Sequence, residues 1–255
     1  MRLRKLMFPS IHRKFGGKFK GCISGGAPLD LEVGAFIETL GIDILEGYGL
    51  SEASPVVSVN TKEAKKFGSV GRAIPGVEVK TDPETGELMV KGDNIMKGYY
   101  HQPELTADVI EPDGWLHTGD IAKIDDEGFI YITGRIKNMI VLNGGKKVFP
   151  EEVEALLQQS PMFQEVCVVG TKRQGGQKDG TEDITAVIVP VKEIAEENPD
   201  DKELLIKIRA EVKTLSQRLS LFKRPTNIII SRDLLPRTAT SKIKRKDVKN
   251  LAENR

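Results

Sequence analysis

Residues 18–30 read KFKGCISGGAPLD, a short apolar run that stops at two glycines and a proline. The run predicts a strand over 19–24, and the helical spacing of apolar residues over 29–40 predicts a helix after it. Gly41 ends this helix, and IDIL at 42–45 predicts a second strand. A strand, a helix and a strand with glycine-rich loops at the strand ends indicate an α/β fold that binds ligands at those loops.

Two further changes of pattern divide the rest of the chain. The α/β piece, which opens with a predicted basic helix over 1–20, extends to about residue 67. From about 68 to 135, short alternating strands and turn sequences such as DPETGE predict a β-rich subdomain. Over 136–255 the sequence predicts a separate α+β domain. Its strands are expected at 165–170, 184–190 and 227–231, and its helices are expected to begin at Pro150 and after the polar stretch 191–203.

The composition is that of an ordinary globular protein, and the formal net charge of +1 gives no argument for nucleic acid or an acidic membrane as a partner. Cys22 and Cys167 are far apart in sequence and suit a reducing cytosol, so we expect a cytoplasmic protein. The apolar runs are too short to span a membrane, and the first residues do not have the pattern of a signal peptide.

Two glycine-containing loops follow the predicted strands. In YGLSE at 48–52, the Ser51 hydroxyl could contact a phosphate and the Glu52 carboxylate could bind Mg²⁺, a hard cation that prefers oxygen ligands. The alternative is an ordinary loop. SGGAP at 24–28 would let the backbone approach a flat ligand closely, because glycine has no Cβ, but a plain turn explains it as well.

Three later stretches also carry candidate residues. GWLHTGD ends at Asp120, which could accept hydrogen bonds from both ribose hydroxyls or could be an exposed turn aspartate. His117 in the same stretch is interpreted as a partly buried hydrogen-bonding residue. Arg135 precedes a Gly144-Gly145 loop, and LPRTATSKIKRK at 235–246 is a flexible basic segment or a solvated tail. The sequence has no G-x-x-x-x-G-K-[ST], G-x-G-x-x-G or zinc motif.

In order and spacing, these five stretches resemble the acyl-adenylate-forming enzymes, and among them most resemble the long-chain fatty acid–CoA ligases. The resemblance runs from about residue 15 to 247. It implies the C-terminal portion of a large adenylate-forming N-domain, followed by a small mobile α+β domain. It also implies a two-step reaction, in which ATP and a fatty acid give acyl-adenylate and pyrophosphate, and CoA then gives acyl-CoA and AMP. ATP, Mg²⁺ and CoA are the implied cofactors and co-substrates.

The resemblance also implies roles at matching positions. Ser51 matches a hydroxyl on phosphate, Glu52 a carboxylate linked to Mg²⁺, Asp120 the ribose ligand and Arg135 a contact to ribose and phosphate. Lys242 matches the lysine that acts in adenylation. The remaining matches are the adenine-binding wall of Gly25, Gly26, Ala27, Pro28, Tyr48 and Gly49, the hinge at Lys137, and the pantetheine channel loop of Gly144 and Gly145.

The chain departs from the family pattern at several points. Ser241 replaces the usual glycine before Lys242, many relatives have aspartate at Lys137, and proline is more common at Asp93. The family's Gly-, Ser- and Thr-rich phosphate loop ending in Pro-Lys-Gly does not occur in the 255 residues. We therefore expect a C-terminal half that is inactive alone. The alternatives are another acyl-CoA synthetase, an adenylation domain that loads a carrier protein, or a non-catalytic nucleotide-binding half that pairs with a separate N-terminal chain.

Overall fold

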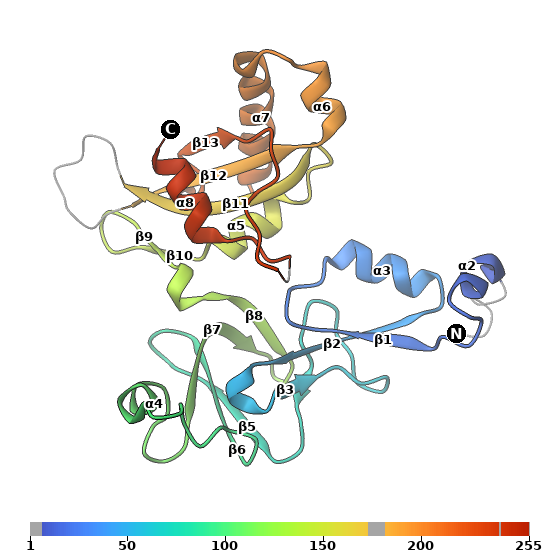
Figure 1. Cartoon of the computed structure of the whole chain (residues 1–255), viewed down its shortest axis with the longest axis vertical. Helices are drawn as coiled ribbons and strands as arrows, with labels where there is room; N and C mark the ends of the chain where they lie inside the picture. The colour runs from blue at the N-terminus through green and yellow to red at the C-terminus, as the bar shows by residue number, and fades with distance from the viewer. Residues whose placement is uncertain (1–6, 173–181, 240, 255) are drawn as a thin grey trace. The chain divides into compact units, whose positions relative to one another are not determined.

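A computed structural model gives the fold of residues 7–172, 182–239 and 241–254. The chain divides into two compact units, Met1–Thr133 and Gly134–Arg255, each with its own sheets (Figure 1). Within the described ranges, no helix is both long enough and apolar enough to cross a membrane. The mixed α/β architecture expected from the sequence is confirmed.

The first unit begins with the α/β piece. Strand β1 pairs parallel with β2, with Cys22 opposite Ile44, and helix α3 connects them. The Asp30 side chain caps α3 by accepting hydrogen bonds from the backbone N–H groups of Glu32 and Val33, both at 2.9 Å. β2 then pairs antiparallel with β3, and β3 with β4. The elements are α2 (Pro9–Lys14), β1 (Gly21–Ser24), α3 (Leu31–Thr39), β2 (Asp43–Gly49), the 3₁₀ helix η1 (Ser51–Ala53), β3 (Val56–Val59) and β4 (Arg72–Ala73).

The β-rich part of this unit is a four-stranded sheet in the order β5-β6-β7-β8. Its buried face, which includes Leu88, Val90 and Ile130, packs with Ala53 and Val57 of the preceding piece into one core. The core therefore fixes the turn after β2 against the sheet. The elements are β5 (Val77–Thr81), β6 (Glu87–Gly92), α4 (Pro103–Val109), β7 (Leu116–Ile124) and β8 (Ile130–Arg135).

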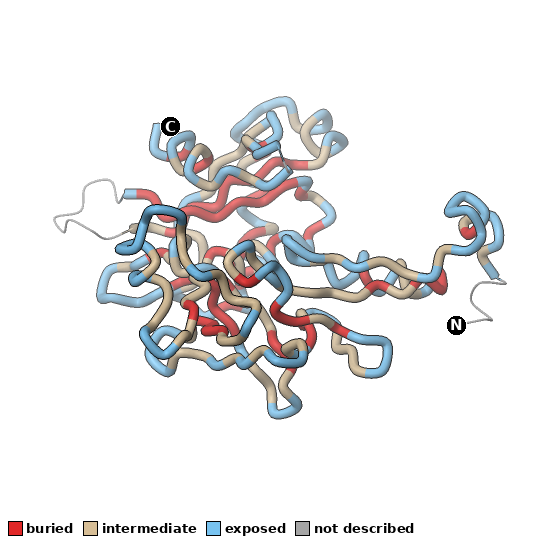
Figure 2. The backbone as a smooth tube through the Cα atoms, turned by 60° about the horizontal axis from the view of Figure 1, so that its bottom comes forward, coloured by how far each residue is buried: buried red, intermediate tan, exposed pale blue. Residues whose placement is uncertain are grey.

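The second unit is built on the sheet β11-β12-β13, in which β11 and β12 are antiparallel and β12 and β13 parallel. Figure 2 shows β11 and β12 buried along most of their length. Helices cover both faces, which explains why both strands are nearly continuous apolar runs. The elements are η2 (Ile136–Asn138), β9 (Ile140–Val141), β10 (Lys147–Val148), α5 (Pro150–Leu157), β11 (Phe163–Lys172), β12 (Glu182–Pro190), α6 (Lys192–Glu197), α7 (Asp201–Ser216), η3 (Leu221–Lys223), β13 (Asn227–Ile230) and α8 (Arg245–Glu253).

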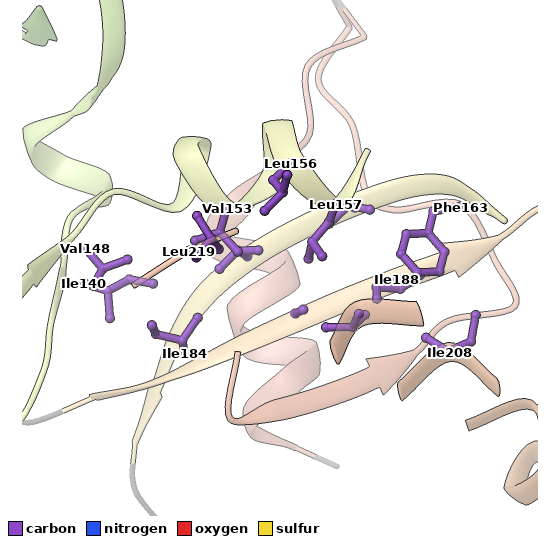
Figure 3. Packing of buried hydrophobic residues seen from close by; sticks show 14 of the residues in the cluster. Ile140, Val148, Val153, Leu156, Leu157, Phe163, Ile184, Ile188, Ile208 and Leu219 are labelled. Carbon is purple, nitrogen blue, oxygen red and sulfur yellow. The ribbon is translucent and has the colours of Figure 1, made fainter. Parts of the chain in front are cut away.

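Alternating residues of β11 and β12 face the two layers of helices. Val166, Val168 and Ile184 pack with α5 and α7, where Val153, Leu157 and Ile208 lie in the same cluster (Figure 3). Cys167, Val169 and Val187 face the other way and pack with Val248 and Ala252 of α8. The alternation follows from the two-residue period of a strand.

Some expected elements differ from the structure. The basic helix expected over 1–20 is the short α2, and residues 1–6 lie outside the described ranges. The polar stretch 191–203 contains α6 and the first residues of α7. Helix α4 was not expected, because it has no buried residue and so no apolar stripe.

Candidate functional site

The turn after β2 carries several predicted site residues. β2 extends through Tyr48 to Gly49, so these two residues belong to a strand end, and Ser51 and Glu52 lie in η1. A Cβ on Gly49 would lie 1.9 Å from the Pro55 carbonyl oxygen. Glycine is therefore required at this position by the β2–β3 connection itself, whether or not a ligand approaches it.

A hydrogen bond brings together two of the predicted motifs. The Tyr48 hydroxyl donates to Oδ2 of Asp120 at 2.7 Å, which joins the end of β2 to β7. Asp120 is only 3% exposed and lies within β7, so the alternative of an exposed turn aspartate is wrong. A nearly buried carboxylate needs hydrogen-bond partners, and Tyr48 provides one of them.

The residues before Asp120 are held by a buried carboxylate that was not singled out in the sequence. Glu87 accepts a hydrogen bond from the Gly119 N–H at 2.7 Å, and its other oxygen lies 2.9 Å from Nδ1 of His117. Nε2 of His117 lies 3.1 Å from Glu111. The hydrogen bond to Glu87 raises the pKa of His117, and Glu111 adds to the effect. His117 is thus the partly buried hydrogen-bonding residue expected from the sequence.

The SGGAP loop lies at the end of β1, beside the end of β2. Gly25, Gly26, Ala27 and Pro28 are all exposed. A Cβ on Gly25 would lie 3.2 Å from the Gly47 carbonyl oxygen, so the loop follows the neighbouring strand closely. The arrangement leaves exposed, side-chain-poor backbone that a flat ligand could approach.

Ser51 is exposed and Glu52 is partly buried. Oε1 of Glu52 accepts a hydrogen bond from the Tyr99 hydroxyl at 3.0 Å. No donor in the described part of the chain pairs with Oε2 of Glu52. A single carboxylate oxygen of this kind fits Mg²⁺, which takes one or two carboxylates and completes its shell with phosphates and water. Over the same residues there is no group of three or more His, Cys, Asp or Glu side chains placed to hold a metal.

In the second unit, the predicted residues lie on short connections. Arg135 is exposed at the last position of β8, and Lys137 is exposed in η2. Gly144 and Gly145 form the tight turn between β9 and β10, with φ of +85° and +76°. This backbone conformation favours glycine, so turn geometry alone accounts for both residues.

Lys242 lies in a closed loop that connects Leu235 to α8. The Thr238 N–H donates to the Lys242 carbonyl at 2.8 Å, and the Lys242 N–H donates to Oγ1 of Thr238 at 3.1 Å. These two hydrogen bonds connect the two sides of the loop, and Thr240 between them lies outside the described residues. The Lys242 side chain itself is exposed.

The loop is attached to the sheet through Glu165 of β11, a second carboxylate not singled out in the sequence. Glu165 is 7% exposed and accepts hydrogen bonds from the Leu235 N–H, at 2.8 Å, and from the Arg237 guanidinium. The same guanidinium also donates to the Ser241 carbonyl. Arg237 therefore ties the residue before Lys242 to the core of the unit.

Sequence comparisons match both units. Residues 3–100 match the AMP-binding enzyme family, and residues 137–254 match the AMP-binding enzyme C-terminal domain. A long-chain-fatty-acid–CoA ligase of Escherichia coli is 34% identical over 99% of this chain and 42% of its own length. The FadD15 long-chain-fatty-acid–CoA ligase of Mycobacterium bovis is 38% identical over 65% of this chain and 27% of its own length. The chain spans 27% to 42% of the length of such relatives.

Solved structures give the same result. ATP-bound MatB from Rhodopseudomonas palustris matches with a TM-score of 0.76 and 32% identity, over 91% of this chain and 45% of that one. The o-succinylbenzoate–CoA synthetase MenE of Bacillus subtilis, in complex with ATP and magnesium, matches with a TM-score of 0.73 and 26% identity, over 94% and 50%. With both units matched and the motifs in order, the chain belongs to the AMP-binding enzyme family.

Proposed function

We propose that this chain forms the C-terminal portion of an ATP-dependent long-chain fatty acid–CoA ligase. The observation that supports it most directly is the hydrogen bond between Tyr48 and Asp120, since it joins two sequence motifs 72 positions apart. The long-chain ligases of Escherichia coli and Mycobacterium bovis among its relatives favour a long-chain acid as substrate.

Each candidate residue has a role in this proposal. The exposed SGGAP backbone and Tyr48 form the wall for adenine, and Asp120 accepts hydrogen bonds from the ribose. Ser51 contacts a phosphate, and Oε2 of Glu52 faces Mg²⁺, which when bound neutralises charge on the phosphates. Lys242 supplies a point charge where negative charge develops during adenylation. Arg135 contacts ribose and phosphate.

The second unit also has a role in the thioester-forming step. Lys137 serves as the hinge of a mobile domain, and the turn at Gly144 and Gly145 lines the channel for the pantetheine arm of CoA. A small domain with two poses would allow Lys242 to act in the first step and then leave the site for the thiol. Both residues of the turn are exposed, and so is Lys137, as these roles require.

One relative favours a different acceptor. A chloroplastic long-chain-fatty-acid–[acyl-carrier-protein] ligase of Arabidopsis thaliana is 35% identical over 77% of this chain. The second candidate is therefore transfer of the acyl group to a carrier-protein thiol. Supplying either free CoA or a phosphopantetheinylated carrier protein and measuring which thioester forms separates the two functions.

The function is tested by fatty-acid-dependent exchange of labelled pyrophosphate into ATP. We expect exchange in a ligase that joins these residues to an N-terminal portion with a phosphate loop, and none with the 255 residues alone. In the ligase, Asp120→Ala should raise the KM for ATP about 10²-fold, because hydrogen bonds to a charged group contribute roughly 1.5–3 kcal/mol each. Unchanged ATP affinity with lost activity would show that Asp120 is not the ribose ligand.

The same exchange assay separates the remaining alternatives. Robust exchange by the 255 residues alone would contradict the proposal that the chain is one portion of a larger active unit. A ligase with no exchange for any acid, but with measurable ATP binding, would instead support a non-catalytic nucleotide-binding half.

A further inference from the structure

The segment 92–99, between β6 and α4, is attached by three hydrogen bonds to η1 and by a fourth to the first residue of β3. The Met96 N–H donates to the Glu52 carbonyl at 2.8 Å. The Asn94 side chain donates to the carbonyls of Ala53 and Val56, both at 3.0 Å. The remaining bond is the one from the Tyr99 hydroxyl to Oε1 of Glu52. Backbone and side chain of Glu52 are thus held by the same segment.

Tyr99 is itself fixed by α4. Its N–H donates to Oγ1 of Thr106 at 2.9 Å, and that hydroxyl donates to the Gln102 carbonyl at 2.9 Å. Gly98 lies so close to Thr106 that a Cβ on the glycine would be 2.9 Å from two of its side-chain atoms. The phenol is therefore presented to Glu52 from a rigid support. Its neighbour Tyr100 points to solvent and is 86% exposed.

We propose that Tyr99 is the positioning residue for Glu52, holding Oε1 so that Oε2 is directed at the magnesium ion of the Mg²⁺–nucleotide substrate. The proposal rests on the function proposed above, because it needs Glu52 as the Mg²⁺-linked carboxylate. A carboxylate on a 3₁₀ turn otherwise samples several side-chain rotamers, and each added rotamer weakens the ion contact.

The test is the Mg²⁺ dependence of acyl-adenylate formation at a fixed, low concentration of ATP. In the ligase, Tyr99→Phe should raise the Mg²⁺ concentration for half-maximal rate about tenfold, which corresponds to about 1.4 kcal/mol. The kcat at saturating Mg²⁺ should stay within about threefold of wild type. Tyr100→Phe removes the same hydroxyl from the next residue and should leave the Mg²⁺ dependence unchanged.

Glu52→Gln distinguishes failure of this inference from failure of the proposed function. If Glu52→Gln leaves the Mg²⁺ dependence unchanged, Glu52 is not the metal-linked carboxylate and the functional assignment itself is wrong. If Glu52→Gln shifts it but Tyr99→Phe behaves like Tyr100→Phe, the assignment stands and the positioning role is overturned. A lower kcat in Tyr99→Phe without a shift in Mg²⁺ dependence overturns it too, since a purely structural defect gives that result.

A second measurement needs no activity and uses the 255-residue chain. The four tyrosines can be labelled with ¹³C at Cζ and observed by NMR. Glu52→Gln should shift the Cζ resonance of Tyr99 and leave that of Tyr100 unchanged, because Tyr99 donates a hydrogen bond to Glu52 while Tyr100 points to solvent. The same Tyr99 resonance in wild type and variant would show that the hydrogen bond is not formed in solution.

Discussion

Helix α8 is joined to the rest of the second unit by an ion-pair network whose loss should be measurable. The Arg245 guanidinium pairs with both oxygens of Glu154, at 2.9 Å for the Nη2–Oε2 contact, and donates to the Val168 carbonyl. Glu154 also accepts the Val168 N–H at 2.6 Å. Because α8 directly follows the Lys242 loop, the network fixes the C-terminal end of that loop.

Glu154→Ala removes both acceptors and leaves the guanidinium and the Val168 N–H without them. The side chains of Arg245 and Glu154 are 25% and 19% exposed, so the pair is mostly buried. Breaking a buried pair by removing one partner costs about 3–5 kcal/mol. The residual exposure and the remaining contact of Arg245 with Glu151, at 3.5 Å, favour the low end, about 3 kcal/mol. Alanine is a good helix former, so α5 itself should not be weakened.

Glu152→Ala is the matched control, because it makes the same change two residues earlier in α5. Glu152 pairs with Lys223 at 2.6 Å, but its side chain is 42% exposed. Such a surface pair contributes about 0–1 kcal/mol. The two variants therefore differ in burial and connectivity of the lost pair, while residue type and helix are the same.

The assay is hydrogen exchange of the central β12 amides over a urea series, because these amides report global opening of the second unit alone. With a slope of about 2 kcal/mol per M, Glu154→Ala should lower the urea midpoint by about 1.5 M, and Glu152→Ala by less than about 0.5 M. Equal midpoints for the two variants would refute the reasoning that Arg245 and Glu154 hold α8 in place.

Two further predictions concern the candidate site. In the ligase, Lys242→Ala should lower the adenylation rate about 10²–10³-fold. The same variant should still form acyl-CoA from supplied acyl-adenylate and CoA at near wild-type rate. Equal losses in both half-reactions would show that Lys242 does not act in the first step alone. Because the pKa of His117 is raised on folding, its stabilising effect is complete below about pH 6.5 and is lost as the pH rises through the folded value. Urea unfolding of the first unit, followed by the fluorescence of Trp115, should therefore show stability that falls as the pH rises above about 6.5 in wild type and falls less in His117→Gln. The same slope in both proteins would contradict this prediction.

Much of the fold could be predicted from local patterns. The strands at 165–170 and 184–190 and the helix from Pro150 have clear apolar patterns, because each packs against a core. The elements that were missed, α4 and α6, contribute no buried residue and so leave no periodic signal. Their short length and position on the surface hide them from pattern analysis.

The candidate site was harder to predict because its partners are distant in sequence. Nothing local in KGYY at 97–100 indicates that Tyr99 contacts a residue 47 positions earlier. Glu87 and Glu165 are likewise buried carboxylates in strands, where the sequence alone favours exposure. Their partners, His117 and Arg237, become evident only once the strands are paired.

Ser241 shows how such a distant contact can replace a local preference. Its φ of +62° lies in the left-handed region, which explains why glycine is usual before the adenylation lysine in the family that this chain resembles. A serine there costs about 1 kcal/mol relative to glycine. The Arg237 guanidinium donates to the Ser241 carbonyl while it is held by the buried Glu165, and this charge-assisted contact offsets a cost of that size. The Lys242 loop is therefore held in shape by its attachment to β11, so that the backbone freedom of a glycine is not needed.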